Sequence, residues 1–99
     1  MWYNNTMRWW NKLIQNKVNT MNTTEELLVI FMEECSEAAI EASKIIRFGK
    51  GTERLESEIG DLVCMIKLLE EQGMIDMKNV EYCADAKREK LKKWSNLNV

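Results

Sequence analysis

The sequence contains no proline and no histidine, and only four of its 99 residues are glycine. Proline and glycine interrupt helices and mark turns, so their scarcity favours long, continuous helices. Residues that form helices well, namely Glu, Lys, Leu, Met and Ala, are plentiful. We therefore predict one small all-α domain. A chain of this length buries only a modest core by itself, which favours self-association.

Cysteine is also sparse. Cys35, Cys64 and Cys83 lie far apart in the sequence and form no CxxC pair. Without histidine, a zinc site would need these scattered thiolates alone, so zinc is a poor interpretation. Unpaired cysteines are typical of proteins in a reducing compartment, where they act as small buried hydrophobic residues. We expect three buried thiols.

Long apolar runs and an excess of positive charge are missing as well. The longest apolar run, LLVIFM at 27–32, is too short to cross a membrane, and the first residues lack the apolar segment of a signal peptide. The net charge of −2 argues against a general nucleic-acid binder. We therefore expect a cytoplasmic protein whose partners include neither a membrane nor a nucleic acid.

The chain divides into an N-terminal extension over residues 1–22 and a helical domain over residues 23–99. A helix over 3–18 is one interpretation of the extension, since apolar residues there share a face. In the domain, three helices are expected over 24–48, 52–72 and 77–94. The predicted helix ends are Thr23 or Thr24, Gly49, Gly73 and Asp76.

Short connections predict that neighbouring helices pack antiparallel. The first two helices would then form a helical hairpin, to which the last adds a third long helix. A second chain would complete a core resembling a four-helix bundle.

Two stretches, EECSEAAIEA at 33–42 and ESEIGD at 56–61, place acids within the apolar faces of the first two helices. At about 100° per residue, Glu37 lies about 60° from Glu34, and Asp61 lies about 60° from Glu58. In an antiparallel hairpin these two pairs can face each other. The apolar residues that share the two faces include Phe31, Ala38, Ile45, Leu62, Met65 and Leu69.

Four carboxylates in a partly dry place would repel one another unless a cation neutralised them. Mg²⁺ binds oxygen ligands in an octahedral shell, whereas zinc prefers nitrogen and sulfur. Di-iron sites in helical bundles use histidine, which is absent. The pattern therefore predicts a Mg²⁺ site, with Mn²⁺ as a substitute, and ordinary solvated acids are the alternative. The predicted ligands are Glu34, Glu37, Glu58 and Asp61.

Basic residues accompany the acids. Lys87 lies on the apolar face of the third helix and Lys90 on its flank, where they could neutralise the acids or bind a phosphate. Arg54, one turn before Glu58, is a weaker candidate for phosphate binding. The connection after the first helix is basic, which suits an anionic ligand without requiring one; its cations are Lys44, Arg47 and Lys50.

The motifs EECSE at 33–37 and ESEIGD at 56–61 together resemble the EExxE…ExxD signature of the MazG-like all-α nucleoside triphosphate pyrophosphohydrolases. The resemblance runs from about Glu25 to Trp94. It implies that the four acids named above bind Mg²⁺, that Glu34 or Glu37 also holds the attacking water, and that Lys87 stabilises the leaving pyrophosphate. The family commonly has N-x-K-x-x-R on the following helix, whereas DAKREK here has Asp for Asn and Lys90 for Arg.

The resemblance further implies hydrolysis of a nucleoside triphosphate to its monophosphate and pyrophosphate, as nucleotide-pool housekeeping by a homodimer or a dimer of dimers. Trp9, Trp10 and Trp94 are candidates for base contacts or for the core or dimer interface. Two other functions remain open. One is a non-catalytic dimerisation or interaction module whose acids pair with basic residues, and the other is a metal or nucleotide sensor that binds without turnover.

Overall fold

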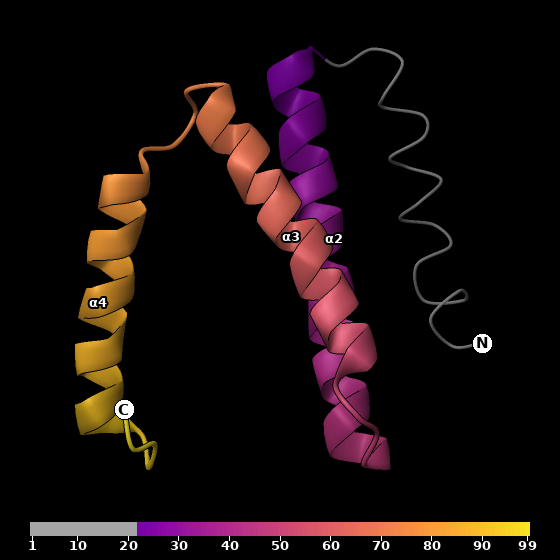
Figure 1. Ribbon diagram of the computed structural model, residues 1–99, viewed down its shortest axis with the longest axis vertical. Helices are drawn as coiled ribbons and strands as arrows, with labels where there is room; N and C mark the ends of the chain where they lie inside the picture. The colour runs from indigo at the N-terminus through magenta and orange to yellow at the C-terminus, as the bar shows by residue number, and fades with distance from the viewer. Residues whose placement is uncertain (1–21) are drawn as a thin grey trace. The chain divides into compact units, whose positions relative to one another are not determined.

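The computed structural model describes residues 22–99, so the predicted helix over 3–18 lies outside the described part. Residues 22–99 contain three helices and no strand, which confirms the all-α prediction for this range. They are α2 (Thr23–Phe48), α3 (Glu53–Glu71) and α4 (Met77–Trp94), coloured from indigo to yellow along the chain (Figure 1).

The start of α2 differs from the prediction. Thr23 and Thr24 were expected as N-caps, but both lie within the helix, and the N-cap is Asn22. Its backbone is extended, and its side-chain oxygen accepts a hydrogen bond of 2.8 Å from the backbone N–H of Glu25. The prediction was wrong because Asn satisfies this exposed N–H at least as well as Thr does.

The other helix ends follow the predictions. Gly49 caps α2 with φ of 65° and donates its N–H to the carbonyl of Ile45 at 2.9 Å. Gly73, with φ of 71°, closes the end of α3 in the same left-handed region, which glycine adopts without steric cost. Asp76 caps α4 by accepting a hydrogen bond of 3.0 Å from the backbone N–H of Lys78.

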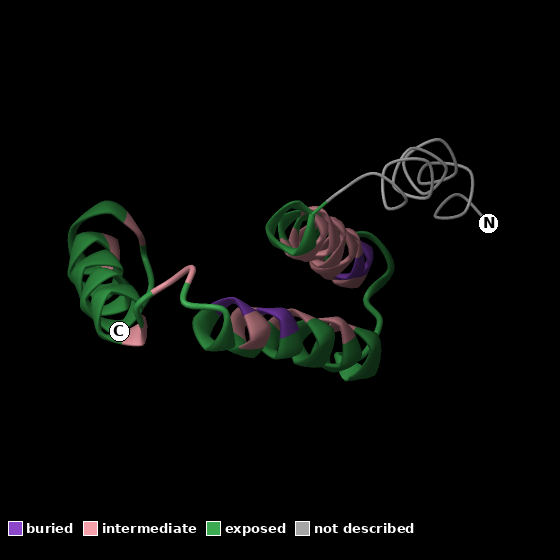
Figure 2. Ribbon diagram, turned by 90° about the horizontal axis from the view of Figure 1, so that it is seen from above, coloured by how far each residue is buried: buried purple, intermediate pink, exposed green. Residues whose placement is uncertain are grey.

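The helices α2 and α3 run antiparallel and lie side by side, joined by the turn over residues 49–52 (Figure 1). The buried and half-buried parts of α3 lie mainly along the side that faces α2 (Figure 2). Among the described hydrophobic residues, only Met65 and Leu69, both on α3, are buried. We call the line along which α2 and α3 face each other the seam. Polar and apolar residues both lie along it, but a single chain buries little apolar surface there.

Residues 69–99, which include α4, form a second compact unit. No residue of α4 is buried, and the apolar side chains predicted to share a face with Lys87 include Val80 and Trp94, which are both exposed. None of the helices in the described range is long and apolar enough to span a bilayer.

The prediction of three buried thiols was wrong. Cys64 and Cys83 are exposed, and Cys35 is half-buried. Each lies on a side of its helix that the rest of the described chain leaves partly or fully open to solvent.

Candidate metal centre

Three of the four predicted ligands meet on the seam of the hairpin. Glu34 and Glu37 come from adjacent turns of α2, and Glu58 comes from α3. One carboxylate oxygen from each lies within 4.8 Å of the others, and all three residues are half-buried. The i, i+3 spacing on α2 puts its two acids on one face, and the antiparallel packing brings Glu58 opposite them. We call these three residues the acidic cluster.

Asp61, the fourth predicted ligand, is exposed and does not belong to this group of mutually close oxygens. Its charge nevertheless acts on the cluster, because it raises the pKa of both Glu34 and Glu58. A residue about 60° from the centre of a helix face lies at the edge of the contact with the neighbouring helix. Asp61 is therefore close to the cluster and open to solvent.

Two oxygens of the cluster are buried without a hydrogen bond. The Oε2 atoms of Glu34 and Glu58 are inaccessible to solvent and accept no hydrogen bond from a described residue. Neither side chain forms an ion pair with a lysine or arginine of the described range. Leaving a carboxylate oxygen in this state is unfavourable, since it loses water and gains no partner.

The titration of the cluster reflects this cost. Burial, and next the charge of Glu37, raise the pKa of Glu34 to about 7. Burial also raises the pKa of Glu58 to about 7, followed by a hydrogen bond to Glu37, which favours the protonated form. The pKa of Glu33, on the flank of the cluster, is raised as well, by burial and then by the charge of Glu37.

These properties fit a hard divalent cation. The cluster offers only carboxylate oxygens, the donors that Mg²⁺ and Mn²⁺ prefer, and it contains no sulfur or nitrogen ligand for zinc. A cation would also give the two orphaned oxygens a partner and would remove the mutual repulsion of the acids. The cluster is thus one that could hold a hard divalent cation.

A different arrangement occupies the next turn of the seam. Glu41, one turn beyond Glu37 on α2, forms an ion pair of 3.1 Å with Lys44. Both side chains are only 10 % exposed. The sequence pattern placed Glu41 within the apolar face, but the pairing was missed. The signal was the i, i+3 spacing of opposite charges in EASK.

The predicted basic residues fall into two groups. Arg54 lines a pocket at the turn of the hairpin together with Glu41 and Lys44. Lys87 and Lys90 are exposed on α4, in the second unit of the chain, so their contact with a phosphate stays a prediction. Trp94 is 84 % exposed, and the other two candidate tryptophans, Trp9 and Trp10, lie outside the described residues.

No family model, no curated protein and no solved structure matches this chain. The resemblance to MazG-like enzymes therefore depends on the motifs of the sequence alone.

Proposed function

We propose that the protein is a Mg²⁺-dependent nucleoside triphosphate pyrophosphohydrolase of the MazG-like class. One observation carries the proposal: carboxylates from both acidic motifs converge within 4.8 Å, and two of their oxygens are buried with no hydrogen bond. Ligands of a hard cation are expected to converge in this way, because the cation removes their mutual repulsion. Glu34, Glu37 and Glu58 would hold Mg²⁺, and we propose Asp61, whose charge raises the pKa of Glu34 and Glu58, as the fourth ligand.

The substrate class follows from the same chemistry. Mg²⁺ bound at such a site would neutralise the charge of the phosphates and draw the triphosphate to the seam. Cations of the chain would supply a second contact with that charge. We propose Lys87, Lys90 and Arg54 as the phosphate-binding residues, with Lys87 stabilising the leaving pyrophosphate.

The chain's own acids would handle the water. A carboxylate of Glu34 or Glu37 orients a water against the α-phosphorus and accepts its proton as the new P–O bond forms. The bond from the α-phosphorus to its bridging oxygen breaks, and the products are the nucleoside monophosphate and pyrophosphate. The two acids are adjacent on α2, so one can hold the water while the other two members of the cluster keep the metal.

A second copy of the chain fits the hairpin. Exposed apolar side chains of α2 lie about 120–160° from Glu34, and those of α3 lie about 100–140° from Glu58, in the same rotational sense. Because the helices are antiparallel, both stripes come to the same face of the hairpin. A homodimer or a dimer of dimers would cover this face and complete a four-helix core. The exposed residues are Leu28, Met32, Ile59 and Val63.

The test is a hydrolysis screen. The purified protein is incubated with Mg²⁺ and each common NTP and dNTP, and the products are separated by chromatography. The Glu58→Gln variant should lose turnover, because it removes a metal ligand without changing the size of the side chain. Glu70→Gln, which changes an exposed acid at the far end of the same helix, is the matched control and should stay active.

The products discriminate among the alternatives. Monophosphate and pyrophosphate support the proposal, and the best substrate identifies the preferred base and sugar. Diphosphate and phosphate would contradict the assignment of the bond. Stabilisation by Mg²⁺ with no turnover would favour a metal or nucleotide sensor, and no response to Mg²⁺ would favour an interaction module.

A further inference from the structure

The turn of the hairpin contains a pocket that none of the three residues of the acidic cluster lines, although Arg54, proposed above as a phosphate-binding residue, belongs to it. It has a volume of about 250 Å³ and lies between the last turns of α2 and the first turn of α3. Since a water molecule takes about 30 Å³ in the liquid, this volume holds roughly eight waters. The pocket is thus large enough for a small oxyanion with part of its hydration shell.

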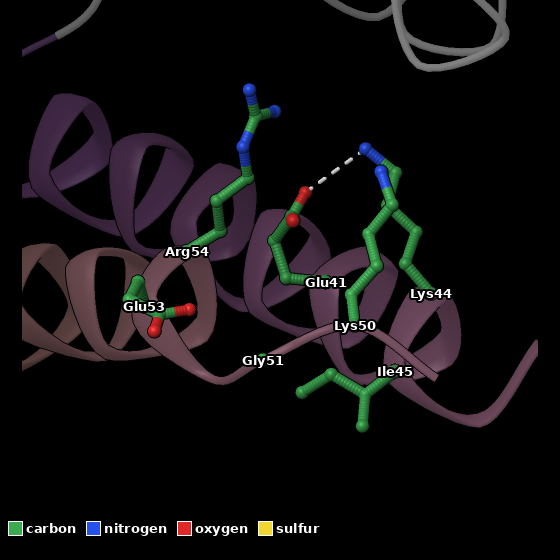
Figure 3. Close-up of a pocket in the computed structure, with 7 residues that line it drawn as sticks. All are labelled: Glu41, Lys44, Ile45, Lys50, Gly51, Glu53 and Arg54. Atoms are coloured by element: carbon green, nitrogen blue, oxygen red, sulfur yellow. Dashed lines mark hydrogen bonds and ion pairs between the residues drawn. The ribbon is translucent and has the colours of Figure 1, made fainter. Parts of the chain in front are cut away.

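Positive charge dominates this pocket. Lys44, Lys50 and Arg54 line it, and their side chains extend to the same side of the hairpin (Figure 3). The segment 41–54 carries four cations and two carboxylates, a net +2, in a chain whose net charge is −2. The turn is therefore locally positive in a chain of negative net charge, and it would attract an anion.

The cations do not all have the same role. Lys44 is paired with Glu41 at the floor of the pocket, with both side chains 10 % exposed. Lys50 and Arg54 form no ion pair with any acid of the described residues. Together with the carboxylate of Glu53, which also lines the pocket, they leave a net charge of +1, which attracts a phosphate group. The guanidinium fork and the ammonium together suit a tetrahedral oxyanion.

One acid competes for the same space. The carboxylate of Glu53 lines the pocket and folds back over Gly51, where an added Cβ would lie 2.5 Å from its Oε2. Gly51 therefore leaves room for this carboxylate, which stands in the pocket where an anion would bind. Glu53 is exposed, so it can turn out to solvent when a stronger anion arrives.

We propose that this turn pocket is a metal-independent binding site for a phosphate group, held by Lys50 and Arg54 over the Glu41–Lys44 pair. It lies one helical turn from the acidic cluster on both helices, since Glu41 follows Glu37 and Arg54 precedes Glu58 by four residues each. The phosphate can belong to free pyrophosphate or to the phosphate chain of a nucleotide, and the pocket recognises the group that both share.

The test measures binding without metal. Sodium pyrophosphate and, separately, ATP are titrated into the full chain in EDTA, with affinity from calorimetry and the binding site from backbone amide shifts. Lys50→Gln and Arg54→Gln should each weaken binding about tenfold, because each removes one charge-assisted contact. Glu53→Gln should tighten binding several-fold. Lys67→Gln, an exposed lysine of α3 outside the pocket, is the control and should change nothing.

Pyrophosphate binding with these signs supports a site for the free oxyanion, and binding of ATP alone with the same signs supports a site for the nucleotide's phosphates. The proposal is overturned by no binding of either probe, by equal loss in the Lys67 control, or by amide shifts confined to other residues. Because no metal or turnover enters the measurement, binding here with no hydrolysis would defeat the proposed function and leave this inference standing.

Discussion

Buried acids at two turns of the seam differ in whether the described chain gives them a cationic partner. At Glu41 the seam supplies a lysine at 3.1 Å, and both side chains are almost fully covered. At Glu34, about two turns earlier on α2, and at Glu58 on α3, the described chain supplies no cation, and an oxygen of each acid is buried without a hydrogen bond. A protein that can compensate one buried acid can compensate another. The uncompensated turn therefore points to a partner that the described residues of the hairpin do not provide.

The largest effect should come from breaking the uncompensated turn. Glu58→Gln removes a negative ligand from the acidic cluster and should lower turnover about 1,000-fold, since a bound cation supplies several kcal/mol of transition-state stabilisation. Steady-state kinetics with the best nucleotide of the screen measures this. Glu41→Gln, which changes an acid of the compensated turn, should keep most of the activity. Equal losses in the two variants would contradict the distinction between the two turns.

The converse experiment concerns stability. Glu41→Ala removes the carboxylate that faces Lys44 in a nearly dry place and should lower the free energy of unfolding by about 3 kcal/mol. Urea denaturation monitored by circular dichroism measures it. The double variant Glu41→Leu with Lys44→Met keeps the volume but removes both charges, and it should recover most of the loss. If the double variant is no more stable than Glu41→Ala, the loss of stability does not come from leaving the charge of Lys44 without its partner.

The pH dependence of stability separates the two turns again. Glu34 and Glu58 have pKa values raised from an ordinary 4.5 to about 7, so the folded metal-free chain binds more protons than the unfolded chain between these values. The stability that these two groups contribute is present below pH 4.5 and is lost as the pH rises to about 7. Thermal melts in EDTA across this range should fall with pH.

The pH experiment has two controls. Replacing both Glu34 and Glu58 with Gln should flatten the fall, because Gln does not titrate. Mg²⁺ at pH 8 should restore stability to the unmodified chain and have a much smaller effect on the double variant. A metal-free chain whose stability rises steadily from pH 4.5 to 7 would contradict the raised pKa values.

The sequence predicted much of this arrangement, and the reasons are local. Gly49 and Gly73 end helices through their backbone freedom, and Asp76 begins one through its side-chain hydrogen bond, so distant residues mattered little. The convergence of Glu34, Glu37 and Glu58 required only a helical period and an antiparallel hairpin.

The predictions that were wrong concerned how far a residue is exposed to solvent. Helical position alone did not indicate that Asp61 would be open to solvent or that Cys64 and Cys83 would be exposed, because exposure depends on which elements cover each side of a helix. The proposed role of Lys87 stays a prediction, because it lies in the second unit of the chain. Helical period also placed Glu41 on the seam, but the depth of its burial came from packing.

The smallest effect should come from an ion pair of the same spacing in a different environment. Glu89 and Lys92 on α4 lie 2.8 Å apart, closer than Glu41 and Lys44, but their side chains are 68 % and 48 % exposed. Water screens such a pair and solvates either partner when the other is removed, so Lys92→Ala should change the free energy of unfolding by about 0.5 kcal/mol or less. Urea denaturation beside Glu41→Ala makes the comparison direct. Equal losses from the two pairs would mean that spacing rather than burial governs their contribution. The burial of Glu41 and Lys44 would then give their ion pair no larger contribution to stability than an exposed pair makes.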